Sequence, residues 1–208
     1  MTYGFAPSAE PASAGAGHGD RSVRAPRTGA VHEAEGPVHA GRRAGDGRAA
    51  SVLAEYAARY GAPGLPIPID SIAVDLLGLR VRCVEGLGVS GLLVPGRREI
   101  CLSAEEAADS EARRRFTLAY EVAHWVLHHR GRCARSHRTP GSLDPREREA
   151  NVFAAELLMP TDAVRSVAAS GPVRSAARRF GVSTVAMGWR LYDLGLADRP
   201  PEDAAPGG

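Results

Sequence analysis

Five consecutive residues near the middle of the chain carry side chains that could perform metal-assisted hydrolysis. They read Tyr120-Glu121-Val122-Ala123-His124. In the motif H-E-x-x-H, two histidines one helical turn apart bind a single Zn²⁺, and the glutamate activates a water on that metal. Glu121 and His124 keep the base and second-ligand positions of this motif, whereas Tyr120 stands where the first histidine would be. The segment therefore predicts a zinc site in which one ligand is altered.

Two helices must position these side chains. The first is predicted from about Glu111 to His129, and it is apolar over most of its circumference, so we expect it to be the central helix of the domain. The second is predicted to begin at Asp144-Pro145, because aspartate caps helices and proline suits the first helical position. It ends near Met159-Pro160, because proline cannot continue a helix.

Three short strand-like runs precede the long helix, at Leu79–Val84, Ser90–Val94 and Glu99–Leu102. The turn Pro95-Gly96-Arg97-Arg98 makes the last two a hairpin. We therefore expect a short, three-stranded antiparallel sheet in a helix-rich α+β fold.

Two polar residues in this half of the chain are predicted helix caps. Asp70 is placed to cap a helix from Ser71 to Leu77. Ser103 is followed three residues later by Glu106, which is the pattern of a capping box.

Helical spacing also predicts a helix over Ser51–Tyr60. Thr161 is expected to cap a further short helix, which stops at Ser170-Gly171-Pro172. Towards the end of the chain, Arg174–Phe180 and Thr184–Leu194 have the proportions of a helix-turn-helix. A recognition helix needs several polar side chains that reach base edges, and Arg190 is the only cation of the second helix. We interpret this unit as docked on the main domain or in contact with a protein partner, so that direct nucleic-acid binding is a weaker alternative.

The segments on both sides of the altered motif closely resemble the ImmA/IrrE family of metallo-endopeptidases. The family pattern R-F-T-x-A-H-E-x-x-H matches from Arg115 to His124 except at Tyr120. The pattern E-x-x-A-N-x-F-A-x-x-L-L-M-P matches from Glu147 to Pro160. The resemblance extends over about Ser51 to Leu196.

This resemblance implies a zincin-like zinc peptidase that acts on a regulatory protein, such as a helix-turn-helix repressor. By position, Glu121 would be the catalytic base, and His124 and Glu147 would be zinc ligands. Glu149 competes with Glu147 for the third-ligand role. We prefer Glu147, because its i+4 neighbour Asn151 would lie on the same face of the helix.

The tyrosine makes zinc binding and catalysis doubtful on chemical grounds. A catalytic zinc site usually has three protein ligands, and only His124 and Glu147 remain. Tyr120 has a reference pKa of about 10 and a longer reach than histidine, so the metal would have to displace a proton and move. We therefore keep open a catalytically inactive pseudopeptidase that binds the same kind of partner.

A shifted metal site is a further alternative. His124 and His128 are themselves one turn apart, and Cys133 and His137 follow in the next loop. In this register the residue after the first histidine is Trp125, which cannot act as a base. Metal binding without peptide hydrolysis would result. We prefer the alternative that His128 and His129 mark the exposed end of the helix, where cations suit the helix dipole.

Composition limits the remaining classes of function. A formal net charge of +2 gives no strongly basic field for a polyanion. Three cysteines without a C-x-x-C pair support neither a disulfide framework nor a zinc knuckle. No secretory signal and no apolar run of ~18 residues is visible, so we expect a cytoplasmic protein without a membrane segment.

Composition also suggests how the chain is divided. Residues 1–48 are rich in Ala, Gly, Pro and Arg and cannot bury a core, which predicts a disordered tail. We expect the zincin-like domain over residues 49–170, the helix-turn-helix-like unit over 171–198, and a second disordered tail over 199–208.

Overall fold

The computed structural model describes residues 47–128, 145–168 and 171–201. All of the described residues belong to one compact unit. Residues 1–46 and 202–208, which include most of the two predicted tails, lie outside the described residues. None of the helices in the described ranges has the length and apolar character to cross a bilayer.

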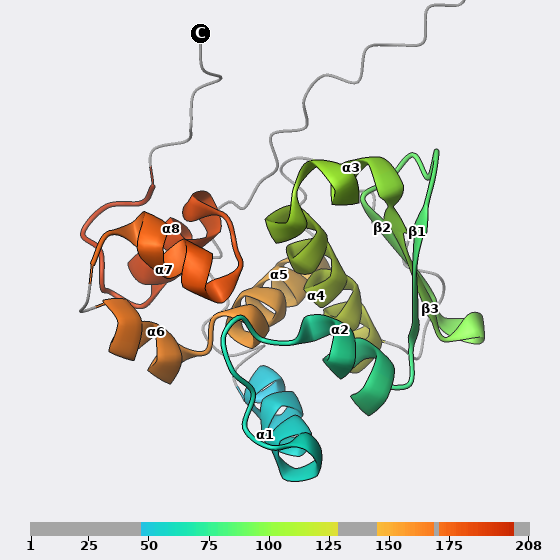
Figure 1. The fold of residues 1–208 in the computed structure, drawn as a ribbon, viewed down its shortest axis with the longest axis horizontal. Coiled ribbons are helices and arrows are strands. Elements are labelled where there is room, and N and C mark those ends of the chain that lie inside the picture. Colours follow the sequence, from blue (N-terminus) through green and yellow to red (C-terminus); the bar gives the residue numbers. More distant parts are fainter. Residues whose placement is uncertain (1–46, 129–144, 169–170, 202–208) are drawn as a thin grey trace, which may run out of the picture. The chain divides into compact units, whose positions relative to one another are not determined.

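The described residues form a helix-rich α+β fold with one small sheet, as predicted (Figure 1). A π-helical turn, Ile72–Leu76, continues α2, and a 3-10 turn, Pro95–Arg97, joins β2 to β3. The helices are α1 (Arg48–Tyr60), α2 (Ile69–Ser71), α3 (Ala104–Asp109), α4 (Glu111–His128), α5 (Pro145–Leu158), α6 (Thr161–Ala168), α7 (Val173–Phe180) and α8 (Thr184–Asp193). The strands are β1 (Arg80–Val84), β2 (Gly91–Val94) and β3 (Glu99–Ser103).

Local capping chemistry explains where several helices begin. Ser103 Oγ accepts a hydrogen bond from the backbone N–H of Glu106 at 3.2 Å, which confirms the predicted cap of α3. The Glu106 carboxylate bonds to Ser90 instead of returning to the cap, so the reciprocal half of a capping box is absent there. The prediction for Asp70 is wrong: Pro68 is the N-cap of α2, and Asp70 lies within the helix. Its carboxylate is engaged by a longer-range partner, Arg114.

The sheet has the strand order β1-β3-β2, which corrects the predicted all-antiparallel arrangement. The hairpin is confirmed, because β2 pairs antiparallel with β3 and Gly91 lies opposite Leu102. However, β1 pairs parallel with β3, with Arg80 opposite Glu99. The physical reason lies in burial: β3 is the most buried strand and takes the centre, while β1 has exposed arginines that suit an edge.

Helix α4 lies at the centre of the described domain (Figure 1). One side packs on β2 and β3, and another packs extensively on α5, which also contacts α1. Its buried apolar residues include Leu118, Ala119, Val122 and Ala123, all with no exposed surface. The prediction of an apolar central helix is confirmed.

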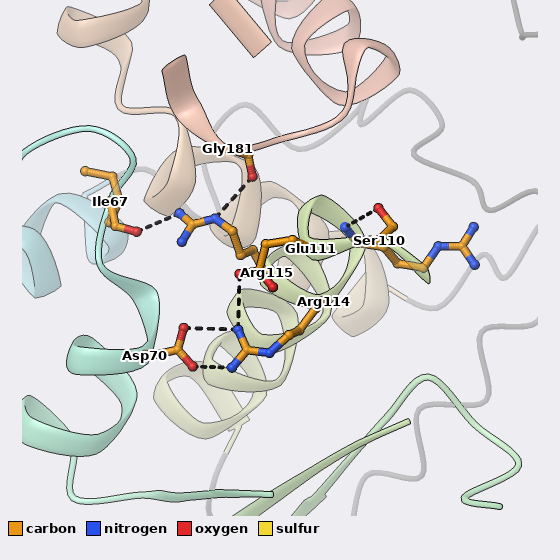
Figure 2. A network of polar contacts seen from close by, with 8 residues as sticks. Ile67, Asp70, Ser110, Glu111, Arg114, Arg115 and Gly181 are labelled. Atoms are coloured by element: carbon orange, nitrogen blue, oxygen red, sulfur yellow. Dashed lines mark hydrogen bonds and ion pairs between the residues drawn. The ribbon is translucent and has the colours of Figure 1, made fainter. Parts of the chain in front are cut away.

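Two buried arginines join the C-terminal helices to the rest of the domain. Arg115 of α4 donates from Nε to the carbonyl oxygen of Gly181 at 3.1 Å, and from Nη2 to that of Ile67 at 2.6 Å (Figure 2). Arg190 of α8 donates to the carbonyl oxygen of Met159 and to Thr161 Oγ1, at 3.1 and 3.0 Å. Helices α7 and α8 are therefore fixed to α4 and to the end of α5.

Candidate site between helices α4 and α5

Tyr120 and His124 occupy neighbouring positions on one face of α4. Because they are four residues apart, their side chains lie one turn above the other. The two rings meet edge to face, with centroids 4.7 Å apart and planes at 86°. Both residues are 3% exposed, so this face of α4 is closed to bulk solvent.

Glu147 reaches the same face from the first turn of α5. Its Oε2 atom accepts a hydrogen bond from the Tyr120 hydroxyl, and its Oε1 atom lies 3.7 Å from His124 Nε2. Burial raises the pKa of the Glu147 carboxyl above its usual range, because the charged form loses hydration there. The residues named from the sequence for the metal position thus meet, and the tyrosine bonds directly to the carboxylate.

Of the two candidate carboxylates on α5, it is Glu147 whose side chain contacts both Tyr120 and His124. Glu149 lies two residues further along the helix, on a different side.

Glu121 lies between α4 and the edge of the sheet, and none of its surface is exposed. A Cβ atom added at Gly91 of β2 would lie 2.8 Å from Glu121 Oε1 and 2.7 Å from Thr117 Cγ2. Only a residue without a side chain allows β2 to approach α4 so closely at this point. The sequence analysis did not single out Gly91, although a glycine at the start of an apolar strand can signal close backbone approach.

Arg98 is a second neighbour that sequence reasoning missed. Its backbone is left-handed, with φ at 50°, and its guanidinium lies 5.0 Å from the ring centroid of Trp125, the residue after His124. The same guanidinium donates to the carbonyl oxygens of Leu77 and Gly78, at 2.6 and 3.2 Å. The ring contact ties the hairpin to α4 beside the candidate site, and the two hydrogen bonds tie it to the segment before β1. Nothing in a turn sequence signals these contacts.

The donor groups at this position do not fit an ordinary catalytic zinc site. In the described part of the chain, no three His, Cys, Asp or Glu side chains come close enough to hold a metal ion. His124 and Glu147 supply two donors, and the third position holds a phenol that is already bonded to Glu147. The alternative ligand His128 ends α4, but its side chain, like Cys133 and His137, falls outside the described residues.

A search of curated proteins finds no significant match. Among solved structures, a chain described as a Mycobacterium tuberculosis transcriptional regulator is similar, with a TM-score of 0.49 and 18% sequence identity. The match covers 74% of this chain and 48% of that chain, so this protein spans about half of the regulator's length.

A family model supplies the assignment. The model of the IrrE N-terminal-like domain matches residues 78–192, which is more than half of the chain. The match includes the sheet, α4 with Tyr120 and His124, and α5 with Glu147. The chain therefore belongs to the family of IrrE N-terminal-like domains.

Proposed function

We propose that this chain is a regulatory pseudopeptidase. It would bind a regulatory protein of the kind that ImmA/IrrE peptidases cut, such as a helix-turn-helix repressor, and leave its peptide bonds intact. The alternative is an active zinc peptidase in which Glu121 is the general base.

The observation that carries this proposal is the hydrogen bond from the Tyr120 hydroxyl to Glu147. In the family pattern, Glu147 would donate its carboxylate to zinc. Here the carboxylate is satisfied by a neighbouring side chain within the protein, and burial raises its pKa. A metal ion bound by both side chains would have to break this hydrogen bond and remove the phenol proton.

The surroundings of the site support binding of an extended peptide. Strand β2 is at the edge of the described sheet, with β3 as its one neighbour there. An edge strand presents backbone N–H and C=O groups that can pair with an added strand. Because Gly91 brings β2 against Glu121, a peptide paired with β2 would run beside the altered motif.

Direct DNA reading by α8 has little support. Arg190 is the only cation on this helix, and it is buried and donates to Met159 and Thr161. Its guanidinium is therefore committed to the protein interior and cannot extend to base edges.

The proposal is tested by measuring zinc in purified wild-type protein beside a Tyr120→His variant. We expect far less than one zinc per chain in the wild type. The Tyr120→His variant should take up about one zinc per chain, since three protein ligands then complete the site. The Tyr120→His, Glu147→Ala double variant should lose that zinc again.

A Tyr120→Phe variant is the matched control, because it removes the hydroxyl without supplying a ligand. It should stay free of zinc. Stoichiometric zinc in the wild type that disappears on Glu147→Ala would contradict the pseudopeptidase proposal and favour the peptidase.

A further inference from the structure

Helix α7 has two faces of very different character. Ala176, Ala177 and Phe180 are buried against the rest of the domain. The outer face carries three exposed arginines, Arg174, Arg178 and Arg179, which we call the α7 arginine strip. No carboxylate pairs with any of the three within the described residues.

Stabilisation of the helix itself accounts for only part of this strip. Cations near the C-terminal end of a helix interact favourably with its dipole, which suits Arg178 and Arg179. Arg174, however, lies in the first turn, where a cation opposes the dipole. The first turn also contains no acidic residue that would offset it. Helix stabilisation therefore leaves the charge of Arg174 unexplained.

The strip is held in place by a buried contact. Gly181 ends α7 in a left-handed conformation, and its carbonyl oxygen accepts from Arg115 of α4 (Figure 2). A Cβ atom added at Gly181 would lie 3.0 Å from Arg115 Nε and 3.0 Å from Pro66 Cβ, so the joint is tightly packed. Arg115 precedes Tyr120 by five residues on the same helix. The strip is therefore preorganised relative to the candidate site.

The charge of the strip selects an acidic partner, and the neighbouring helix indicates its class. A DNA-binding helix pair needs polar or basic side chains on α8. There Thr184 is exposed, Val185 and Trp189 are half-buried, and Arg190 is buried. A few cations on one short helix give weak phosphate binding. An acidic protein surface needs only complementary charge at the rim of an interface.

We propose that the α7 arginine strip docks an acidic face of the protein partner. This inference rests on the proposed function as a partner-binding module, and it adds the chemistry that the partner must present. Docking at α7 would hold the partner on the same rigid framework that carries the altered motif.

The test uses the full chain and two probes, a fluorescein-labelled oligoglutamate peptide and a labelled duplex DNA. Binding is followed by fluorescence anisotropy at low and high ionic strength. We expect the peptide to bind at low salt and to be released at high salt. The Arg174→Ala, Arg178→Ala, Arg179→Ala triple variant should bind it about tenfold more weakly.

The matched control is an Arg48→Ala, Arg59→Ala, Arg97→Ala triple variant, which changes the net charge equally at exposed positions elsewhere. It should weaken binding by less than about twofold. An equal loss in both variants, or no peptide binding by the wild type, overturns the docking proposal. Tighter binding of DNA than of peptide, lost in the strip variant, overturns the choice of a protein partner.

Two further measurements keep the outcomes separate. Thermal unfolding of the strip variant should match that of the wild type, because the three side chains are exposed. The zinc content of the strip variant should equal that of the wild type. Failure of the docking proposal would therefore not contradict the pseudopeptidase proposal. Failure of the pseudopeptidase proposal would likewise not change the interpretation of the peptide-binding result.

Discussion

The two halves of α4 use polar side chains in opposite ways. In the first half, Arg114 and Arg115 reach out to distant segments: Arg114 forms a two-point ion pair with Asp70, and Arg115 joins Ile67 to Gly181 (Figure 2). In the second half, Tyr120 and His124 both contact Glu147 of the neighbouring helix α5. The first half holds the fold together, while the second contains the residues that match a catalytic pattern.

This difference separates the residues of α4 that hold the fold together from those that match the catalytic pattern. The first half matches the family pattern R-F-T at Arg115, Phe116 and Thr117, and the structure gives the arginine a defined bridging role. The second half departs from the pattern at Tyr120, and the departure yields a hydrogen bond within the protein. The chain therefore keeps the framework of its family, while the carboxylate of Glu147 accepts a hydrogen bond from a residue that departs from the family pattern.

The largest expected effect is on the bridging half of α4. Arg115→Ala would leave the carbonyl oxygens of Ile67 and Gly181 without their donor and would open space in a buried joint. We expect a loss of about 3 kcal/mol in the free energy of unfolding, measured by urea denaturation.

Arg114→Ala provides the comparison. Its carboxylate partner, Asp70, is 47% exposed in its side chain, and an ion pair open to solvent stabilises a fold only weakly. The loss should be about 1 kcal/mol. Equal losses for the two variants would show that Arg115 does not bridge buried segments.

The contact between the middle of α4 and β2 should be the next most sensitive. Gly91→Ala would place a methyl group against Thr117 and Glu121, and the neighbours must shift to accept it. We expect a destabilisation of about 2 kcal/mol in the same urea assay. Gly96→Ala is the control, since a Cβ atom there meets nothing within 4 Å. If Gly91→Ala is as stable as Gly96→Ala, β2 does not lie tightly on α4.

The helices of this fold could be predicted from sequence because their limits depend on local chemistry. Pro145 begins α5, Ser183 caps α8 by accepting from the N–H of Ala186, and Gly181 ends α7 in a left-handed conformation. Each of these signals acts within one turn of the chain. They need no knowledge of what lies across the domain.

The features that escaped prediction all depend on distant partners. Asp70 is of a residue type that often caps helices, but its carboxylate accepts two hydrogen bonds from Arg114 instead. Arg190 has the charge of a surface residue, yet it is buried against Met159. The parallel pairing of β1 with β3 follows from which strand is most buried, and neighbouring turns do not encode it. The family pattern places Glu147 at the site, but it does not predict the hydrogen bond from the Tyr120 hydroxyl to Glu147, because that bond depends on how α4 and α5 pack.

A smaller effect is expected at the second half of α4. Tyr120→Phe removes the hydroxyl that donates to Glu147 and leaves the ring packing on His124 intact. We expect a loss of about 1 kcal/mol in the free energy of unfolding. Tyr56→Phe is the control, because the Tyr56 hydroxyl has no hydrogen bond within the described residues. A loss no larger than that control would mean that the Tyr120 bond contributes nothing to stability.

The smallest effect is a pH dependence that distinguishes two carboxylates. Burial raises the pKa of Glu147 in the folded state. At acidic pH the carboxyl is protonated in both states, so burial carries no charge penalty. As the pH rises through the pKa of Glu147 in the folded state, ionisation of the carboxyl stabilises the unfolded state more than the folded state. Wild-type protein should therefore lose stability relative to Glu147→Gln as the solution moves from acidic to neutral pH.

Glu105 should give a slope of the opposite sign in the same measurement. The backbone N–H of Gly86 donates to its carboxylate and lowers its pKa in the folded state. That contribution is present above the unfolded pKa and is lost as the pH falls through the folded one. The free energy of unfolding of the wild type should thus increase relative to that of Glu105→Gln as the pH rises. The stability difference between wild type and variant could instead change with pH in the same direction for Glu147→Gln and Glu105→Gln. In that case the carboxylate of Glu147 is not buried beside Tyr120, and the contrast between the two halves of α4 fails.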